Sequence, residues 1–271
     1  MDPKLRVISL GAGVQSTTMA LMAAAGEIGP MPDCAIFADT GAEPEGVYKH
    51  LEWLTANLPF PVHIVSAGSI KDDILGSSGR TRFASIPFFI RKADGGQAMA
   101  RRQCTSEYKI TPIRRKVREL LGYAPRQRIP AGAAEVWIGI STDEIQRMKD
   151  SADKWQQHRW PLIETRMSRN DCLAWSAKRG FPKPPKSACT FCPYRDNSGW
   201  RDMRENDPVS FAEAIKVDEA IRDIGVHKKF IGTPYLHRSL KPLDQVDFST
   251  AAERGQTEFG FVQECDGMCG V

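Results

Sequence analysis

The first apolar stretch of the chain, Lys4–Leu10, has Leu5, Val7, Ile8 and Leu10 as its hydrophobic residues and does not follow the strict alternation of a half-exposed strand. Such a run predicts a strand of a parallel sheet that is buried on both faces. Further strands and helices are predicted by short apolar runs and by apolar spacing of three and four residues. The predicted strands are Cys34–Ala38, Val62–Val65 and Glu135–Ile140, and the predicted helices are Ser16–Ala25, Glu45–Asn57, 113–121, Ser168–Arg179 and Val209–Ile224.

This alternation of strands and helices predicts an α/β fold with a doubly wound, mainly parallel, Rossmann-like sheet. The Pro-rich stretch Pro182–Lys186 reads as a stiff linker, so we place a nucleotide-binding domain at 1–180. Residues 181–271 would then hold a helical C-terminal part and a cysteine-bearing tail. The weakly periodic segment 66–103 is interpreted as an insertion, either a substrate-binding lid or a plain surface excursion.

Charge and composition narrow the class of protein. The net charge is +4, which suits an anionic substrate, and Arg and Lys gather between Arg101 and Arg118. A solvated helix face or contact with nucleic acid would each explain that cluster. No apolar run has the roughly 18–20 residues of a membrane helix, and the N-terminus has no signal-peptide pattern. We therefore expect a cytoplasmic protein without a membrane partner.

The turn between the first strand and the first helix is the strongest candidate for a ligand site. Gly11, Ala12 and Gly13 allow close approach of the backbone. We expect Ser16 and Thr17 to satisfy free backbone N–H groups at the helix start. Unpaired N–H groups and the helix dipole together favour a phosphate there.

The window Gly11–Ser16 resembles the pyrophosphate loop, or PP-loop, of the adenine-nucleotide alpha-hydrolase superfamily, Ser-Gly-Gly-x-Asp-Ser. Gln15 stands in place of the Asp, as in the phosphoadenosine phosphosulfate (PAPS) reductase branch. Asp39-Thr40-Gly41 with the later Pro44-Glu45 resembles a second block of that branch, and Gly139–Arg147 resembles a third. The resemblance implies nucleotide-binding residues at these positions: Ser9, Gly11, Ala12, Gly13, Gln15, Ser16, Thr17, Asp39, Thr40, Gly41, Gly139, Glu144 and Arg147.

The seven cysteines are odd in number, and a reducing compartment disfavours disulfides, so metal or redox chemistry is the better explanation. Cys189-x-x-Cys192-Pro suits a zinc site, a redox pair or an iron–sulfur cluster. The Cys104 block is similar to one found near the cluster of iron–sulfur family members, and it has a single cysteine as in the sulfur transferases of DNA phosphorothioation. The resemblance favours a [4Fe-4S] cluster, with zinc as the alternative, on Cys104, Cys189, Cys192 and Cys265.

Cys269 is then left as the sulfur-carrying catalytic thiol, although Cys265 and Cys269 could exchange roles. Cys34 and Cys172 read as core thiols. The tail Glu264-Cys265 partly resembles the nucleophile segment of the sulfonucleotide reductases.

Three functions remain open at this point. In the first, a thiolate attacks an adenylyl sulfate (PAPS or APS) and a thioredoxin-like protein releases sulfite. In the second, ATP with Mg²⁺ adenylates tRNA or DNA, and sulfur from a sulfur donor displaces AMP. The third is a non-catalytic nucleotide-binding module with structural zinc. We favour the first, an oxidoreductase similar to PAPS reductase.

Overall fold

The structure is a computed structural model that describes residues 2–76, 86–227, 232–249 and 253. Its contacts divide the chain into two compact units, and each is described by itself. Unit 1 consists of Met1–Ala67 and Thr105–Ser187, as far as these residues are described. Unit 2 consists of Gly68–Cys104 and the described part of Ala188–Asp266. The predicted boundary near residue 180 stays a prediction, and residues 68–104 pack with the C-terminal segment.

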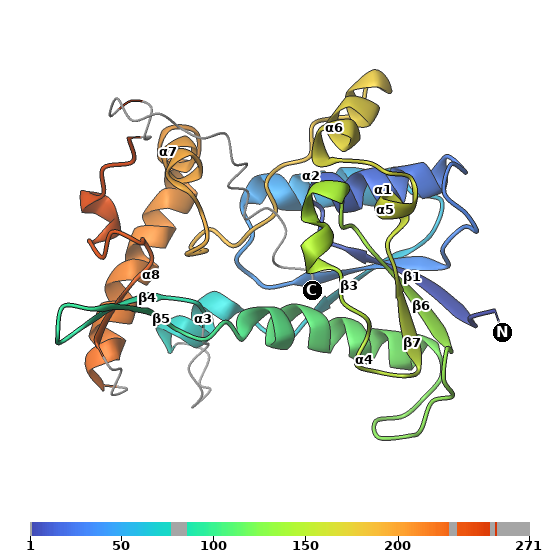
Figure 1. The fold of residues 1–271 in the computed structure, drawn as a ribbon, viewed down its shortest axis with the longest axis horizontal. Helices are drawn as coiled ribbons and strands as arrows, with labels where there is room; N and C mark the ends of the chain where they lie inside the picture. Colours follow the sequence, from blue (N-terminus) through green and yellow to red (C-terminus); the bar gives the residue numbers. More distant parts are fainter. Residues whose placement is uncertain (1, 77–85, 228–231, 250–252, 254–271) are drawn as a thin grey trace. The chain divides into compact units, whose positions relative to one another are not determined.

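Unit 1 contains a five-stranded parallel sheet in the order β3-β2-β1-β6-β7. Helices α1 and α2 cover one face and α4 covers the other (Figure 1). The predicted doubly wound α/β fold is therefore confirmed. The strands are β1 (Leu5–Leu10), β2 (Cys34–Asp39), β3 (Val62–Ser66), β6 (Ala134–Ile138) and β7 (Gln156–Arg159), and the helices are α1 (Val14–Ala24), α2 (Glu45–Asn57), α4 (Thr111–Leu120), α5 (Pro161–Glu164) and α6 (Arg169–Lys178).

Strand alternation divides the core of unit 1 into two layers. Ile8 and Phe37 pack with α1 and α2, whereas their neighbours Val7 and Ile36 pack with Val117 of α4. All five side chains are almost completely buried. A strand buried on both faces needs apolar residues at consecutive positions, which explains the adjacent apolar pairs Val7-Ile8 and Ile36-Phe37.

Three elements of unit 1 differ from the sequence expectation. A π-helical segment, η1 (Thr105–Ile110), precedes α4, and a 3₁₀ segment, η2 (Thr142–Arg147), follows β6. Strand β7 has the polar sequence Gln-Gln-His-Arg and was not predicted. It lies at the edge of the sheet, where burial demands fewer apolar side chains.

Unit 2 is built around an antiparallel three-stranded sheet in the order β5-β4-β8. The segment predicted as an insertion supplies β4 and β5, whereas β8 comes from beyond residue 230. Asp218 of α8, almost fully buried, accepts hydrogen bonds from the backbone N–H groups of Leu236 and Leu243 at 2.8 and 3.0 Å. The elements of unit 2 are α3 (Ile70–Leu75), β4 (Phe89–Lys92), β5 (Gln97–Met99), α7 (Asn197–Asn206), α8 (Pro208–His227), β8 (Gly232–Tyr235) and η3 (Leu243–Gln245).

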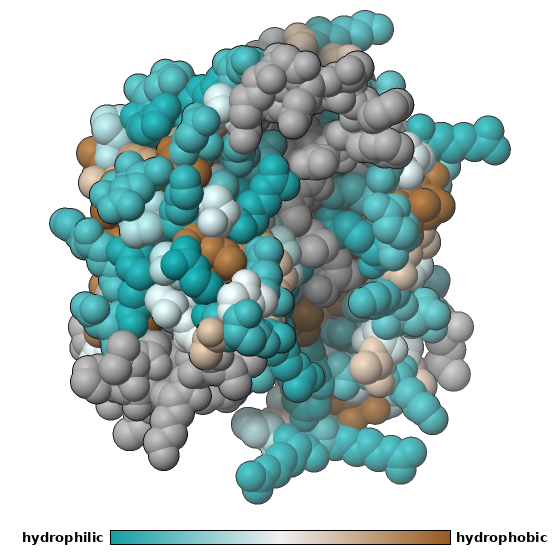
Figure 2. Space-filling model, turned by 60° about the vertical axis from the view of Figure 1, so that its left-hand side comes forward, coloured by the Kyte–Doolittle hydropathy of each residue, from teal (hydrophilic) through white to brown (hydrophobic). Residues whose placement is uncertain are grey.

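No helix in the described ranges is long and apolar enough to cross a bilayer. Figure 2 shows hydrophilic residues over most of the visible face outside the grey atoms, and the hydrophobic residues there form small separate patches.

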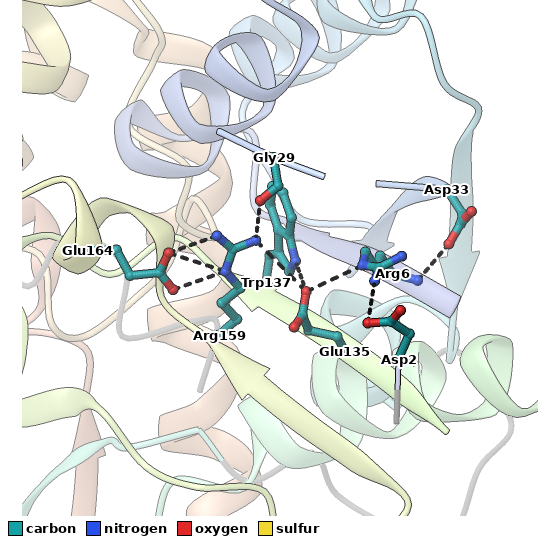
Figure 3. Close-up of polar contacts among 8 residues, drawn as sticks. All are labelled: Asp2, Arg6, Gly29, Asp33, Glu135, Trp137, Arg159 and Glu164. Carbon is teal, nitrogen blue, oxygen red and sulfur yellow. Dashed lines mark hydrogen bonds and ion pairs between the residues drawn. The ribbon is translucent and has the colours of Figure 1, made fainter. Parts of the chain in front are cut away.

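A network of charged side chains joins three strands of unit 1 (Figure 3). Arg159 of β7 forms paired hydrogen bonds to Glu164 and donates to the carbonyl of Gly29 at 2.9 Å. Its guanidinium also lies over the Trp137 ring, 4.6 Å from the centroid. Glu135 of β6 accepts the Trp137 indole N–H at 2.7 Å. The hydrogen bonds to Glu164 raise the pKa of Arg159.

We expect Arg159→Lys to lower the free energy of unfolding by about 1–2 kcal/mol, because lysine loses both the paired hydrogen bonds and the planar stacking. Urea denaturation measures the change. The control is Lys49→Gln, which removes a pair with Glu45 whose two side chains are largely exposed, and we expect no change there. Equal stability of Arg159→Lys and the unmodified protein would contradict a stabilising role for this network.

Candidate functional site

The loop between β1 and α1 leaves a row of backbone donors at the carboxyl edge of the sheet. Helix α1 begins at Val14, and its first backbone hydrogen bond runs from the Thr17 N–H to the Gly13 carbonyl at 3.0 Å. Among the described residues, none accepts a hydrogen bond from the N–H groups of Val14, Gln15 or Ser16. These donors and the positive end of the helix dipole together favour an anion.

Ser16 does not cap the helix in the way expected from the sequence. The N-cap residue is Gly13, which has no side chain, and the Ser16 hydroxyl accepts the Gly11 N–H at 3.1 Å instead. Ala12, between the two glycines, has a φ of 54°, a conformation that residues with a Cβ adopt at a cost. Ser16 therefore closes the loop on itself and leaves the helix N–H groups available.

Gly139 holds the end of β6 against the first turn of α1. A Cβ atom at this position would lie 2.9 Å from the backbone nitrogen and 3.0 Å from the Cα of Ser16. Backbone atoms cannot move aside as a flexible side chain can, so only glycine fits without displacing the loop. The structure shows Gly139 packed against the loop, and the nucleotide contact that the resemblance implies for it stays a prediction.

Gln15 links the loop to the segment after β6. Its side-chain amide donates to Glu144 Oε2 at 3.3 Å and to the Ser141 hydroxyl at 3.5 Å. The other carboxylate oxygen of Glu144 pairs with Arg147, and both side chains are mostly buried. The structure therefore brings together three of the predicted residues, and it adds Ser141, which is fully buried. Its place just beyond β6, at the carboxyl edge, is the signal that could have identified it.

Asp39 is the last residue of β2, and Thr40 and Gly41 follow it at the same edge. Asp39 Oδ1 accepts hydrogen bonds from the Gly41 N–H and the Tyr48 hydroxyl, both at 2.8 Å. Burial and the bond to Asp39 raise the pKa of Tyr48. Thr40 is buried, and Gly41 has a φ of 65°. Ser9, the remaining predicted residue, lies in β1 opposite Ile36.

A buried ion pair lies close to the loop and was missed from the sequence. Glu43, whose side chain is fully buried, pairs with Lys109 at 3.0 Å and accepts the Ser187 hydroxyl at 3.4 Å. Ser187 in turn packs against Gly13. A Cβ atom added at Gly13 would lie 3.6 Å from the Cβ of Ser187. No sequence pattern marks Glu43 as buried, because charged residues in loops are usually exposed.

Several other candidates have structural roles. His50 contacts the Thr17 hydroxyl at 3.0 Å and stacks on Trp53, and burial lowers its pKa. Burial raises the pKa of Cys34 to about 11 and that of Cys172 to about 12, so both thiols stay protonated. Their prediction as core thiols is confirmed.

Most of the basic side chains on α4 form ion pairs or hydrogen bonds within unit 1. Arg114 pairs with Asp153 at 2.7 Å, and Lys116 pairs with Glu119 at 2.6 Å. Arg118 donates to the carbonyls of residues 124 and 127 after the end of α4. These contacts agree with a solvated helix face.

Cys189 and Cys192 lie in one tight turn of unit 2, where the Cys192 N–H donates to the Cys189 carbonyl at 3.0 Å. Both are partly exposed, as is Cys104. No three His, Cys, Asp or Glu side chains within the described ranges are arranged to hold a metal ion. Cys265 and Cys269 lie outside the described residues, and the four-cysteine set stays a prediction.

No protein-family model matches the chain, and no curated protein matches its sequence. Among solved structures, the chain is similar to the PAPS reductase from Candida auris in its phosphate complex, with 16% identity, 67% of this chain and 75% of that chain covered, and a TM-score of 0.45. It is also similar to the U34-tRNA thiolase NcsA from Methanococcus maripaludis with its [4Fe-4S] cluster, with 15% identity, 80% and 72% covered, and a TM-score of 0.38.

Because both TM-scores are below 0.5, the functional assignment rests on the residues of this chain.

We expect Gly139→Ala to displace the loop, because its methyl group would overlap the Ser16 backbone. The variant should unfold at a lower temperature and lose affinity for an anion at the loop, as measured by calorimetry. Gly46→Ala is the matched control, since a Cβ there meets nothing within 4 Å. It lies inside α2, where alanine stabilises by roughly 0.5–1 kcal/mol. Unchanged stability and binding in Gly139→Ala would show that the close approach is unimportant.

Proposed function

We propose that the protein is an enzyme that binds an adenine nucleotide at the carboxyl edge of the unit 1 sheet and performs thiol-based sulfur chemistry on it. One observation carries this proposal: α1 begins, behind a glycine-lined loop, with three N–H groups that have no acceptor among the described residues. The loop lies between β1 and β6, where the strand order reverses direction, and this is where ligands bind in doubly wound sheets.

The absence of charge in the loop suits the anionic end of an adenylyl sulfate. None of the residues from Gly11 to Thr17 carries a charge, so the backbone donors dominate the local potential. Gln15 is neutral, and its amide is held by Ser141 and Glu144. An anionic phosphate–sulfate group would therefore meet donors without an adjacent loop carboxylate.

The proposed reaction begins with a cysteine thiolate, by our prediction Cys269, attacking the sulfuryl sulfur. The bond between that sulfur and the bridging oxygen breaks, and the nucleotide phosphate leaves with the electron pair. The cysteine then carries an S-sulfonate. A dithiol protein of the thioredoxin class reduces the new sulfur–sulfur bond, releases sulfite, and becomes a disulfide while the cysteine regains its thiol.

We expect Gln15→Glu to weaken the binding of PAPS by on the order of tenfold, because a negative charge in the loop would repel the bound anion. Isothermal titration calorimetry measures the affinity. Gln157→Glu adds the same charge at an exposed position of β7 and should bind PAPS normally. Undiminished binding by Gln15→Glu would argue against this loop as the anion site.

Binding titrations and assays of product release together distinguish the proposed reaction from the competing one. Sulfite release from PAPS with thioredoxin supports the proposed reaction. If only ATP with Mg²⁺ binds, and pyrophosphate release requires RNA or DNA, the enzyme transfers sulfur to a nucleic acid.

The proposed [4Fe-4S] cluster on Cys104, Cys189, Cys192 and a tail cysteine is tested by metal analysis of anaerobically purified protein. We expect Cys189→Ser to lose most iron and labile sulfide, because serine is a poor ligand for such a cluster. Cys34→Ala, which removes a core thiol, should keep both. Full iron and sulfide in Cys189→Ser would contradict the ligand set, and zinc without iron would support the structural-zinc alternative.

A further inference from the structure

Unit 2 carries a group of basic side chains without acidic partners. Arg91 and Lys92 lie in β4, and Arg238 and Lys241 lie in the loop after β8. None of the four forms an ion pair with a carboxylate in the described part of the chain. Basic residues elsewhere are commonly paired, among them Lys71 with Glu213, Arg114 with Asp153, Arg201 with Glu253 and Arg222 with Asp218.

Two hydrogen bonds hold Arg91, Arg238 and Lys241 in one place. The Arg91 guanidinium donates to the carbonyl of Leu240, the residue before Lys241. The Gln97 amide, on the strand paired with β4, donates to the Arg238 carbonyl at 3.2 Å. The sheet and the 238–241 loop therefore form one surface, which we call the β4–β8 basic surface.

The polar character of this surface limits the kind of partner. Arg91, Arg238 and Lys241 are exposed, and so are the polar side chains of Gln97 and Thr233. In the described part of this sheet, Met99 is the large apolar side chain that is exposed. Protein–protein interfaces need a buried apolar core, whereas nucleic-acid backbones are bound by Arg and Lys with hydroxyl and amide donors.

The surface is also held rigidly, which favours binding through several simultaneous contacts. Arg91 lies over the Tyr235 ring at 5.0 Å, and this ring belongs to the neighbouring strand β8. Asp218, beneath the same strand and loop, is buried and bonded to Leu236, Leu243 and Arg222. The negative charge of Asp218 is therefore balanced by Arg222 and by these backbone N–H groups.

We propose that the β4–β8 basic surface binds the phosphate backbone of a nucleic acid. The cations would replace counterions condensed on the phosphates, so binding would weaken steeply as salt rises. This inference is independent of the nucleotide site, because it concerns unit 2 and needs no PAPS or ATP.

The test measures fluorescence anisotropy of a labelled RNA hairpin and a labelled DNA duplex of matched length with the full chain, over a range of salt concentrations. We expect the double variant Arg238→Gln/Lys241→Gln to bind about tenfold more weakly at moderate salt. The slope of log affinity against log salt should fall by about two, one for each phosphate that is no longer neutralised. Circular dichroism and thermal melting check that the variant is folded.

The matched control is Arg114→Gln/Arg115→Gln, which removes two charges from α4 of unit 1. It should keep most of the affinity and the original slope. An equal loss in this control, an unchanged slope in the unit 2 variant, or no binding of either nucleic acid by the unmodified protein would overturn the proposal. Binding of labelled polyglutamate as tightly as RNA, abolished in the same variant, would also overturn it in favour of an acidic protein partner.

Discussion

The candidate nucleotide site depends on the close approach between the end of β6 and the first turn of α1. Gly139 permits this approach, since a Cβ would meet the Ser16 backbone at 2.9 Å. The first turn of the helix is thereby fixed relative to two neighbouring strands, β1 and β6. Anion binding by backbone donors is stronger when their geometry is fixed beforehand. Ordering a mobile donor on binding costs conformational entropy and so reduces the affinity. Gly139 permits this geometry because it has no Cβ atom.

A second layer of polar contacts supports the loop. Gln15 connects it to Ser141 and Glu144, and Gly13 packs against Ser187, which bonds to the buried pair of Glu43 and Lys109. A buried carboxylate is costly unless it is paired, so Glu43 and Lys109 are expected to stay together. The loop between β1 and α1 is therefore held by side chains that come from distant parts of the chain.

The sequence predicts unit 1 better than unit 2 for a physical reason. Strands buried on both faces carry apolar residues at consecutive positions, and β1, β2 and β6 are recognisable for that reason. Edge strand β7 and the short strands β4, β5 and β8 carry polar residues and have no such constraint. The loop was predicted from its glycines, but the role of Ser16 and the burial of Glu43 depend on tertiary contacts that no local pattern encodes. The cysteine tail lies outside the described residues, and its proposed role stays a prediction.

The discontinuity of unit 2 has a practical consequence for dissecting the protein. Two strands of its sheet come from residues 89–99 and the third from residues 232–235, so the backbone crosses between the units at residues 67–68, 104–105 and 187–188. A fragment that starts at residue 188 would carry one strand without its partner, and a fragment that ends at residue 187 would leave the hairpin without β8. Truncation cannot assign activities to the two halves, and point substitutions in the intact chain are the suitable tool.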